Sequence, residues 1–202
     1  MESKTLETLT QAVMEKVFVP LEASGRHVHI TAAQAQILFG HDLTQERPLS
    51  QPGQYLSKER VTVKGPKGEL RNVAVLGPAR KEAQVEISLT DARSLGVQPP
   101  VRLSGDVPGS PGCTLIGSCG SVTLSHGVIA AKRHIHLTPA DGARFGVGDQ
   151  QVVSLQTFTT RPTVFEDVVV RISPDFAAAV HLDYDEANAC GFRPGDWGRI
   201  LP

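Results

Sequence analysis

The chain has 202 residues, a net charge of −1 and no run of lysine or arginine, so nothing in its electrostatics predicts nucleic acid or an anionic membrane as a partner. No apolar stretch approaches the roughly 20 residues that span a bilayer, and the first residues, MESKTLETLT, lack the apolar segment of a secretory signal. The content of 19 glycines and 14 prolines against 5% aromatic residues favours many short strands joined by turns.

The three cysteines, Cys113, Cys119 and Cys190, form no C-x-x-C motif and cannot all pair with one another. This usage is typical of a reduced, cytoplasmic compartment. Each thiol is expected to be buried or half-buried, as free cysteines usually are. None of the three lies in a sequence typical of a nucleophile.

Residues 5–18 are expected to form an amphipathic helix, which Pro20 ends. Four apolar residues share one stripe of this helix: Leu6, Leu9, Val13 and Val17. Two roles fit it. The helix can dock on its own domain, or it can present the apolar stripe to a partner protein.

From Val19 onward, short β-branched runs separated by turn dipeptides predict strands. The predicted strands are residues 61–64, 72–76, 84–89, 113–117, 127–132, 151–156 and 164–172. The sequence GPKG at residues 65–68 predicts a hairpin turn, and residues 98–112 carry the strongest loop signal. The fold class is therefore expected to be mainly β with short helices.

An internal repeat occurs four times: a short strand, a Thr or Asp as helix cap, a short helix and a closing glycine. The copies read HVHIT, EISLT, HIHLT and HLDYD, and they start at His27, Glu86, His134 and His181. In the EISLT copy the cap is expected at Thr90. All four first positions carry side chains that can bind a metal ion.

Residues two apart in a strand project from the same face, about 7 Å apart. His27 and His29 can therefore reach one ion, and so can His134 and His136. Such pairs form half of a site for zinc or a neighbouring divalent metal, which a carboxylate or a third imidazole completes. The alternative is that the histidines fill a polar interface between sheets, which explains one pair more readily than two.

Arg80 lies six residues before Glu86 (86 − 80 = 6), so both can border one site. A guanidinium matches the oxygens of phosphate, although a surface ion pair is the usual role of an arginine. No Walker-type loop, G-x-G-x-x-G or G-x-S-x-G occurs, which leaves nucleotide hydrolysis, dinucleotide redox chemistry and serine esterase activity without support. His41 and His126 lie in turn-like sequences and are expected to be solvated.

Several uncommon motifs occur in the order in which one known protein family carries them. They are SGRHVH from Ser24, LSQPGQ from Leu49, VLGPAR from Val75, QVEIS from Gln84, TDAR from Thr90, RHIH from Arg133 and HLDYDEAN from His181. In these motifs, and over residues 19–191, the chain resembles the phosphate propanoyltransferases, also called PduL-type phosphotransacylases. The resemblance implies a reversible reaction in which acyl-CoA and phosphate give acyl phosphate and CoA.

The resemblance also implies two β-barrel domains with short capping helices and internal pseudo-symmetry. Residues 19–25 and 132–202 would form one barrel, residues 26–131 the other, and the active site would lie at the barrel interface. Residues 1–18 would be an encapsulation peptide that places the enzyme in the lumen of a bacterial microcompartment in the cytoplasm.

The resemblance assigns roles residue by residue. The ligands of one metal ion, expected to be zinc, would be His27, His29 and Glu86. The ligands of a second would be His134, His136 and His181. Arg80 would bind phosphate and act in catalysis. The positions that match the CoA-binding region are Ser24, Gly25, Arg26, Arg47, Leu76, Arg133 and Asn188. Two positions depart from the family pattern, since Gly25 replaces an asparagine and Ala74 an arginine.

The expected function is therefore reversible transfer of a short acyl group, propanoyl or acetyl, between CoA and phosphate at a two-metal site. Phosphate would attack the thioester directly, because no activated cysteine or serine is present. The alternatives are a two-metal hydrolase of thioesters or phosphoesters and a non-catalytic metal-binding microcompartment protein. Expected partners are acyl-CoA, CoA, phosphate and acyl phosphate, with microcompartment shell or core proteins at residues 1–18, while a homo-oligomer is left open.

Overall fold

The computed structural model describes residue 10 and residues 13–201. Most of the helix expected at residues 5–18 therefore lies outside the described residues. Residues 13–17 are helical, and the side chains of Val13 and Val17 are exposed. The Phe18 ring contacts Phe158 edge-on, with 5.1 Å between ring centroids.

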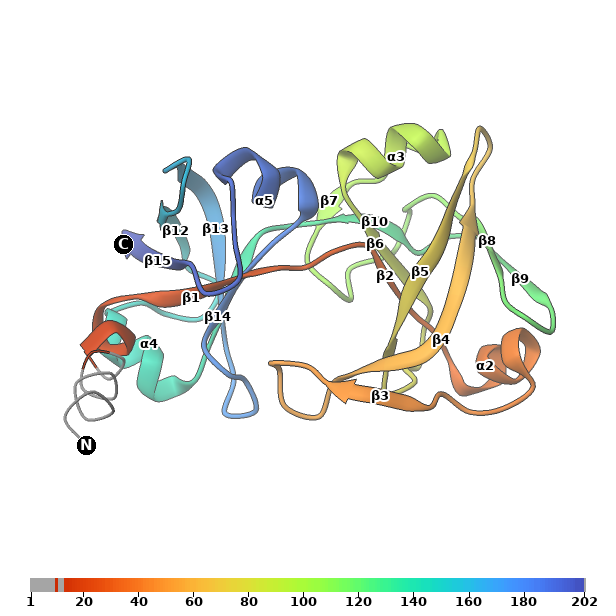
Figure 1. The fold of residues 1–202 in the computed structure, drawn as a ribbon, viewed down its shortest axis with the longest axis horizontal. Helices are drawn as coiled ribbons and strands as arrows, with labels where there is room; N and C mark the ends of the chain where they lie inside the picture. The colour runs from red at the N-terminus through yellow and green to blue at the C-terminus, as the bar shows by residue number, and fades with distance from the viewer. Residues whose placement is uncertain (1–9, 11–12, 202) are drawn as a thin grey trace. The chain divides into compact units, whose positions relative to one another are not determined.

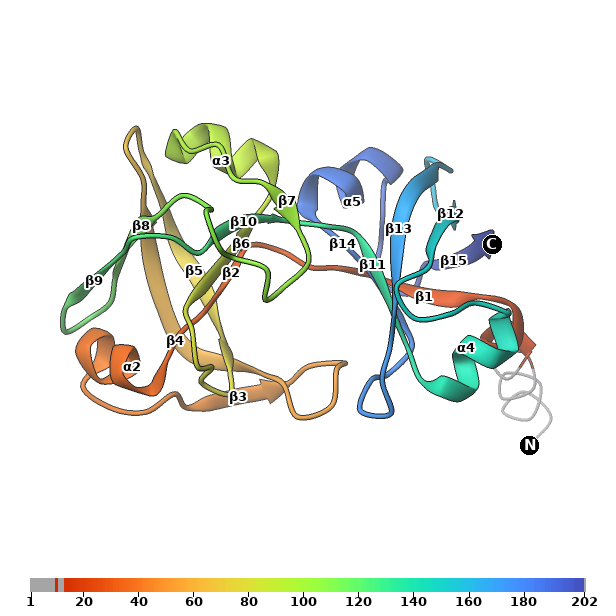
Figure 2. The ribbon, with the colours of Figure 1, turned by 180° about the vertical axis from the view of Figure 1, so that it is seen from behind.

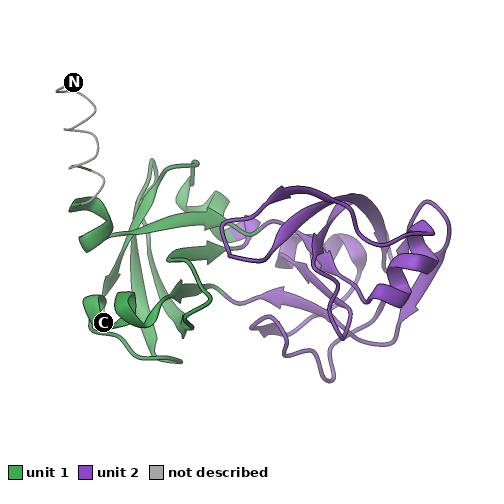
Figure 3. Ribbon diagram, turned by 90° about the horizontal axis from the view of Figure 1, so that it is seen from below, with its two compact units in different colours: residues 1–24, 133–182, 186–202 green, residues 25–132, 183–185 purple. Residues whose placement is uncertain are grey.

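The chain divides into two compact units (Figure 3). Unit 1 comprises residues 1–24, 133–182 and 186–202, and unit 2 comprises residues 25–132 and 183–185. Unit 1 is thus built from distant segments of the chain, and most of unit 2 lies between two of them.

Unit 1 is a closed six-stranded barrel (Figure 1). Its strands follow one another around the barrel as β1 (Val19–Ala23), β14 (Ala179–Leu182), β11 (His134–Leu137), β13 (Val164–Ile172), β12 (Val152–Phe158) and β15 (Trp197–Leu201). β1 pairs with β14 in parallel, whereas β11 pairs with β14 antiparallel. Alternate strand residues fill the barrel with aliphatic side chains such as Ile135, Leu155 and Val180, all fully buried. Helix α4 (Pro139–Phe145) follows β11, and α5 (Tyr184–Cys190) follows β14.

Unit 2 is built on a nine-stranded sheet, seen from behind in Figure 2. Its strand order is β7 (Val101–Arg102), β10 (Val128–Ala131), β6 (Gln84–Ile87), β2 (His27–His29), β5 (Glu69–Gly77), β4 (Tyr55–Lys64), β8 (Cys113–Ile116) and β9 (Ser121–Leu124). β3 (Gln45–Pro48) pairs with β4 off this path. Helices α2 (Ala32–Phe39) and α3 (Leu89–Leu95) follow β2 and β6, and Leu38 and Leu95 are buried in the core of this unit.

The expected fold class, mainly β with short helices, is confirmed. Each predicted strand overlaps an observed one, and the predicted turn at residues 65–68 forms, with the Gly65 N–H donating to the Gly68 carbonyl at 2.9 Å. Four strands were missed: β3, β7, β9 and β15. β3 has the polar sequence QERP and is exposed along its length, and β7 lies inside the segment predicted as a loop. Neither segment carries the alternating apolar pattern that predicts a strand.

The helices that follow the His-x-His strands begin where the repeat predicts. α2 and α4 start five residues after the first histidine of their copies, at Ala32 and Pro139 (32 − 27 = 5; 139 − 134 = 5). Thr31 and Thr138 cap them, each accepting a backbone N–H from the third helical residue. A glycine in the left-handed conformation follows each helix, as predicted.

The other two copies have shorter spacing. α3 and α5 begin three residues after the first position, at Leu89 and Tyr184 (89 − 86 = 3; 184 − 181 = 3). The predicted cap at Thr90 is therefore wrong, because Ser88 accepts the Asp91 N–H and caps α3. The four copies therefore form two kinds of strand–helix unit. β2 and β11 each carry two histidines, whereas β6 and β14 each carry one potential ligand, at the first position of the repeat copy.

The cysteines are free, and Cys113 and Cys190 are buried, as expected. Cys119 departs from the expectation because it is exposed, although its thiol donates to the Phe39 carbonyl at 3.2 Å. His41 and His126 are exposed to solvent, as predicted. Among the described residues, no helix has the length and apolar character required to cross a membrane.

Candidate metal centres

The first group of potential metal ligands lies in unit 2, on the paired strands β2 and β6. Antiparallel pairing sets Glu86 directly opposite His27, and His29 projects from the same face of β2. Glu86 Oε1 lies 3.4 Å from His27 Nε2 and 3.8 Å from His29 Nε2. All three side chains are buried. Two imidazoles and a carboxylate that converge in this way form a donor set for a divalent metal ion.

Burial and the Glu86 carboxylate determine the charges of this group. Burial by itself would raise the pKa of Glu86, but attraction to His27 outweighs it and holds the pKa well below its usual range. Burial would likewise lower the pKa of His27, but the charge and hydrogen bond of Glu86 raise it overall. For His29, burial, then repulsion by His27 and Arg80, keep the pKa well below its usual value. His29 is therefore a neutral imidazole, the form that binds metal ions.

Arg80 is joined to the first group by the hydroxyl of Ser104. Arg80 Nη1 and Gln84 Nε2 both donate to Ser104 Oγ, at 3.0 and 2.9 Å. Gln84 Nε2 also lies 2.5 Å from Glu86 Oε1, and Gln84 Oε1 accepts the Gly105 N–H at 2.7 Å, which fixes the orientation of the amide. Because two donors already point at its oxygen, Ser104 directs its own proton to the Glu86 carboxylate.

Arg80 also lines a small cavity at the edge of this network. The cavity has a volume of about 170 Å³, and Lys81, Gln84 and Gly105 form part of its wall. Two basic side chains, Arg80 and Lys81, and one acidic side chain, Glu82, line it, so the lining carries a net positive charge that suits an anionic ligand.

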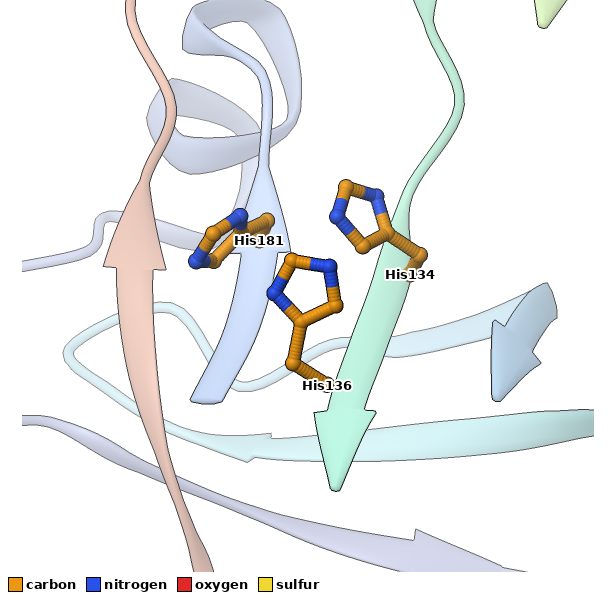
Figure 4. A group of neighbouring side chains, drawn as sticks. All are labelled: His134, His136 and His181. Carbon is orange, nitrogen blue, oxygen red and sulfur yellow. The ribbon is translucent and has the colours of Figure 1, made fainter. Parts of the chain in front are cut away.

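The second group lies in unit 1, on β11 and β14, which pair antiparallel with His134 opposite His181 (Figure 4). The ring centroids are 4.6 Å apart for His134 and His136, 5.0 Å for His134 and His181, and 4.8 Å for His136 and His181. Phe176 stacks on His136 with 4.2 Å between centroids. The three histidines offer one nitrogen each, all within 4.8 Å of one another.

The residues present in both groups fit a divalent metal ion. Each group supplies three nitrogen or oxygen donors from two paired strands, and these donor atoms all lie within 4.8 Å of one another. Three protein ligands leave a coordination position open, which is the arrangement of catalytic zinc sites. The alternative that the histidines merely fill a polar interface between sheets does not explain why both triads converge.

The residues matched to the CoA-binding region are divided between the units. Gly25, Arg26, Arg47 and Leu76 belong to unit 2, whereas Ser24, Arg133 and Asn188 belong to unit 1. Two of the arginines are held by acidic side chains. Arg26 Nη1 lies 2.7 Å from Asp91 Oδ1, and Arg133 Nη1 lies 2.8 Å from Glu186 Oε1. Arg47 is exposed on β3, Leu76 is on β5 and Asn188 is on α5.

The two departures from the family pattern have different surroundings. A side chain at Gly25 would meet the ring of Tyr184, whose Cζ and Oη lie 2.3 Å from the Cβ position. Tyr184 therefore fills the space that the asparagine of the family pattern would need. Ala74 on the neighbouring strand β5 is the direct partner of His27.

Three residues of these networks were missed by reasoning from sequence. Gln84 and Ser104 surround Glu86 and Arg80, and Glu22 on β1 brings Oε2 to 3.3 Å from His181 Nε2. No local motif marks Ser104 or Glu22, since a loop and strand pairing bring their partners near. Gln84 lies in the QVEIS motif, two residues before Glu86 on the same strand. The strand register alone, once known, would have identified Glu22, because it is the partner of His181.

The fold and the two triads define a mainly β scaffold that presents potential metal ligands from paired strands. A family model described as phosphate propanoyltransferase matches residues 20–193. The chain is 52% identical over 198 residues to the phosphate propanoyltransferase of Listeria monocytogenes, covering 97% of this chain and 93% of that protein. It is 55% identical over 183 residues to that of Enterococcus faecalis (90% and 87% covered) and 46% identical over 201 residues to that of Clostridioides difficile (98% and 96%).

The chain therefore belongs to the phosphate propanoyltransferase family and is a transferase. The resemblance seen in its sequence motifs is confirmed over nearly the whole chain.

Proposed function

We propose that this protein transfers a short acyl group, propanoyl or acetyl, reversibly between CoA and inorganic phosphate, using a metal ion in each of the two groups. The observation that carries the proposal is Arg80, a guanidinium held beside His27, His29 and Glu86 through the Ser104 hydroxyl. A fixed guanidinium next to potential metal ligands suits a phosphate substrate. The names of the relatives at 46–55% identity, phosphate propanoyltransferase, support the same reaction.

In the proposed reaction, a phosphate oxygen attacks the thioester carbonyl carbon. A C–O bond forms, the C–S bond breaks, and CoA leaves as a thiolate. Arg80 donates N–H groups to the phosphate and holds it for attack. Seven residues are proposed to contact CoA: Ser24, Gly25, Arg26, Arg47, Leu76, Arg133 and Asn188.

The two triads would hold the metal ions, zinc being the simplest choice for histidine and glutamate ligands. When bound, the ions would supply positive charge for the carbonyl oxygen and for the leaving thiolate. His29, kept neutral by its surroundings, is ready to act as a ligand without losing a proton. That both groups act on one substrate comes from the family resemblance.

The attack is proposed to be direct, without an acyl-enzyme. Burial raises the pKa of the Cys113 thiol to about 12, and Cys190 is also buried, so neither provides a reactive thiolate. Intact-mass analysis after mixing the protein with propanoyl-CoA alone should show no adduct of one propanoyl group. Detection of such an adduct would contradict direct attack.

The decisive assay follows thiol release from propanoyl-CoA by metal-loaded protein, with and without phosphate. Release that requires phosphate supports transfer, whereas release without phosphate supports the two-metal hydrolase. No release under either condition supports the non-catalytic metal-binding protein. Arg80→Ala should raise the KM for phosphate about tenfold or more, the size expected for lost hydrogen bonds to a charged group. The control is Arg102→Ala, which removes an arginine that pairs with Asp106.

The lumen of a bacterial microcompartment is the proposed location. In the described part of the N-terminal segment, Val13 and Val17 are 55% and 45% exposed, so these apolar side chains are available to a shell or core protein. This exposure favours a partner-binding segment over a helix docked along its whole length.

A further inference from the structure

Glu22 lies beside the second group of ligands, although no sequence motif marks it. It is on β1, and parallel pairing with β14 makes it the direct partner of His181. Its Oε2 lies 3.3 Å from His181 Nε2. Side chains of directly paired residues project from the same face of a sheet, so the contact follows from the strand register.

The nitrogen that Glu22 approaches needs a partner. His181 Nε2 is buried and makes no hydrogen bond among the described residues. A buried polar atom without a partner is costly, and a small rotation of the Glu22 side chain would turn this close approach into an N–H···O bond. Figure 4 shows that one ring nitrogen of His181 points away from His134 and His136, toward β1. The other ring nitrogen, Nδ1, then remains for the metal ion.

The first group has a related arrangement with a weaker acceptor. His27 Nδ1 lies 2.8 Å from the Gly25 carbonyl, while His27 Nε2 faces Glu86. In each group, one histidine (His27 or His181) has one ring nitrogen close to an oxygen outside the triad, and its other ring nitrogen can bind the metal ion. A charged carboxylate holds the tautomer of a ligand histidine more strongly than a carbonyl, and it makes the imidazole a stronger ligand.

We propose that Glu22 is a positioning residue of the second metal centre: its carboxylate accepts the proton on His181 Nε2, so that Nδ1 faces the metal ion. The inference rests on the proposed function only in that both require a metal ion in the second group. Glu22 itself does not touch the substrate. It acts through the orientation and the tautomer of His181.

The tautomer can be measured directly in the zinc-loaded protein. Long-range ¹H–¹⁵N NMR correlations of the imidazole rings distinguish a protonated nitrogen from a metal-bound one. We expect His181 to carry its proton on Nε2, with Nδ1 bound to zinc. A spectrum with zinc on Nε2 would overturn the inference, whatever the variants show.

Zinc affinity gives a second, independent measurement. His134→Ala removes a ligand and identifies the zinc of the second group by its loss. In Glu22→Ala, that same zinc should bind about 10- to 100-fold more weakly in a chelator competition, and the other zinc should be unaffected. Glu22→Gln keeps the shape and an acceptor oxygen, so it should fall between Glu22→Ala and the unmodified chain.

The matched control is Glu166→Ala, which removes an exposed carboxylate from β13 of unit 1. Equal zinc affinities in the Glu22 and Glu166 variants would overturn the inference. These results are separate from the test of function. A chain without phosphate-dependent thiol release would refute the proposed reaction, while weaker zinc binding in Glu22→Ala would still support the role of Glu22.

Discussion

At the level of single residues, the position of Arg80 depends on one hydroxyl group. Ser104 accepts hydrogen bonds from Arg80 and Gln84 and directs its proton to Glu86, so its donor and both acceptor positions are used. A hydroxyl with all its bonding capacity engaged restricts the groups around it. The guanidinium and the carboxylate therefore keep a defined distance from each other.

We expect Ser104→Ala to raise the KM for phosphate about tenfold, because Arg80 loses one charged hydrogen bond. The KM for propanoyl-CoA should change by less than about twofold, because an interaction lost to one substrate leaves binding of the other intact. Steady-state kinetics with each substrate varied in turn gives both constants. Ser104→Thr, which keeps the hydroxyl, should restore the phosphate KM.

Ser110→Ala is the matched control for this experiment. Ser110 lies in the same loop, but its hydroxyl bonds to the backbone of Val107 and Gly127. Its loss should lower the stability of the loop without changing the phosphate KM. A similar rise in both alanine variants would show that the loop as a whole, and not the Ser104 hydroxyl, positions Arg80.

A second residue-scale prediction concerns Gly25 and Tyr184. A methyl group at position 25 would lie 2.3 Å from the Tyr184 ring, so Gly25→Ala must displace that ring. We expect a loss of about 1 kcal/mol in the free energy of unfolding, at the low end for overpacking because Tyr184 is half exposed and can move. In the Tyr184→Ala background, Gly25→Ala should be close to neutral. Urea denaturation of the four proteins forms a double-mutant cycle, and strict additivity would contradict the contact.

At the level of elements, the same strand–helix unit is used with two spacings. The long form follows β2 and β11 and is capped by threonine four residues after the first histidine (31 − 27 = 4; 138 − 134 = 4). The short form follows β6, and Ser88 caps its helix two residues after Glu86 (88 − 86 = 2). A long and a short form pair antiparallel in each unit, which brings two histidines of one strand against one ligand of the other.

The caps of α3 can be tested by substitution. Ser88→Ala should reduce the free energy of unfolding by about 1 kcal/mol, the usual cost of losing an N-cap. Thr90→Ala should change it by less than about 0.5 kcal/mol, as for other exposed positions. Equal losses in the two variants, measured by urea denaturation, would contradict the assignment of the cap to Ser88 and not to Thr90.

The repeat explains how much of the site could be predicted from sequence. The metal-ligand candidates stand at matching positions of local motifs, so their residue types and spacing are visible in the chain. The contacts of Glu22 and Ser104 depend on which strands and loops become neighbours, and that information is absent from any short segment. β3 was missed for a related reason: its polar residues are exposed, and it pairs with β4 off the main path of the sheet.

At the level of the whole molecule, the N-terminal segment can be tested apart from catalysis. A chain that begins at residue 18 keeps Phe18 and its contact with Phe158. We expect it to retain the thiol-release activity of the full chain within about twofold, since none of the proposed site residues is removed. Its recovery with purified microcompartments, or its oligomeric state, should change. If neither changes, the result supports the alternative that this segment docks on its own domain and binds no partner.

The interrupted course of unit 1 has a consequence for how the protein is made. β1 emerges from the ribosome early, but its neighbours β14 and β15 are synthesised only near the end of the chain. Unit 2, almost continuous between them, has its whole sheet available sooner and is free to fold while translation continues. The nascent β1 must therefore wait with unpaired backbone groups, and the second metal group, which needs β14, is completed last.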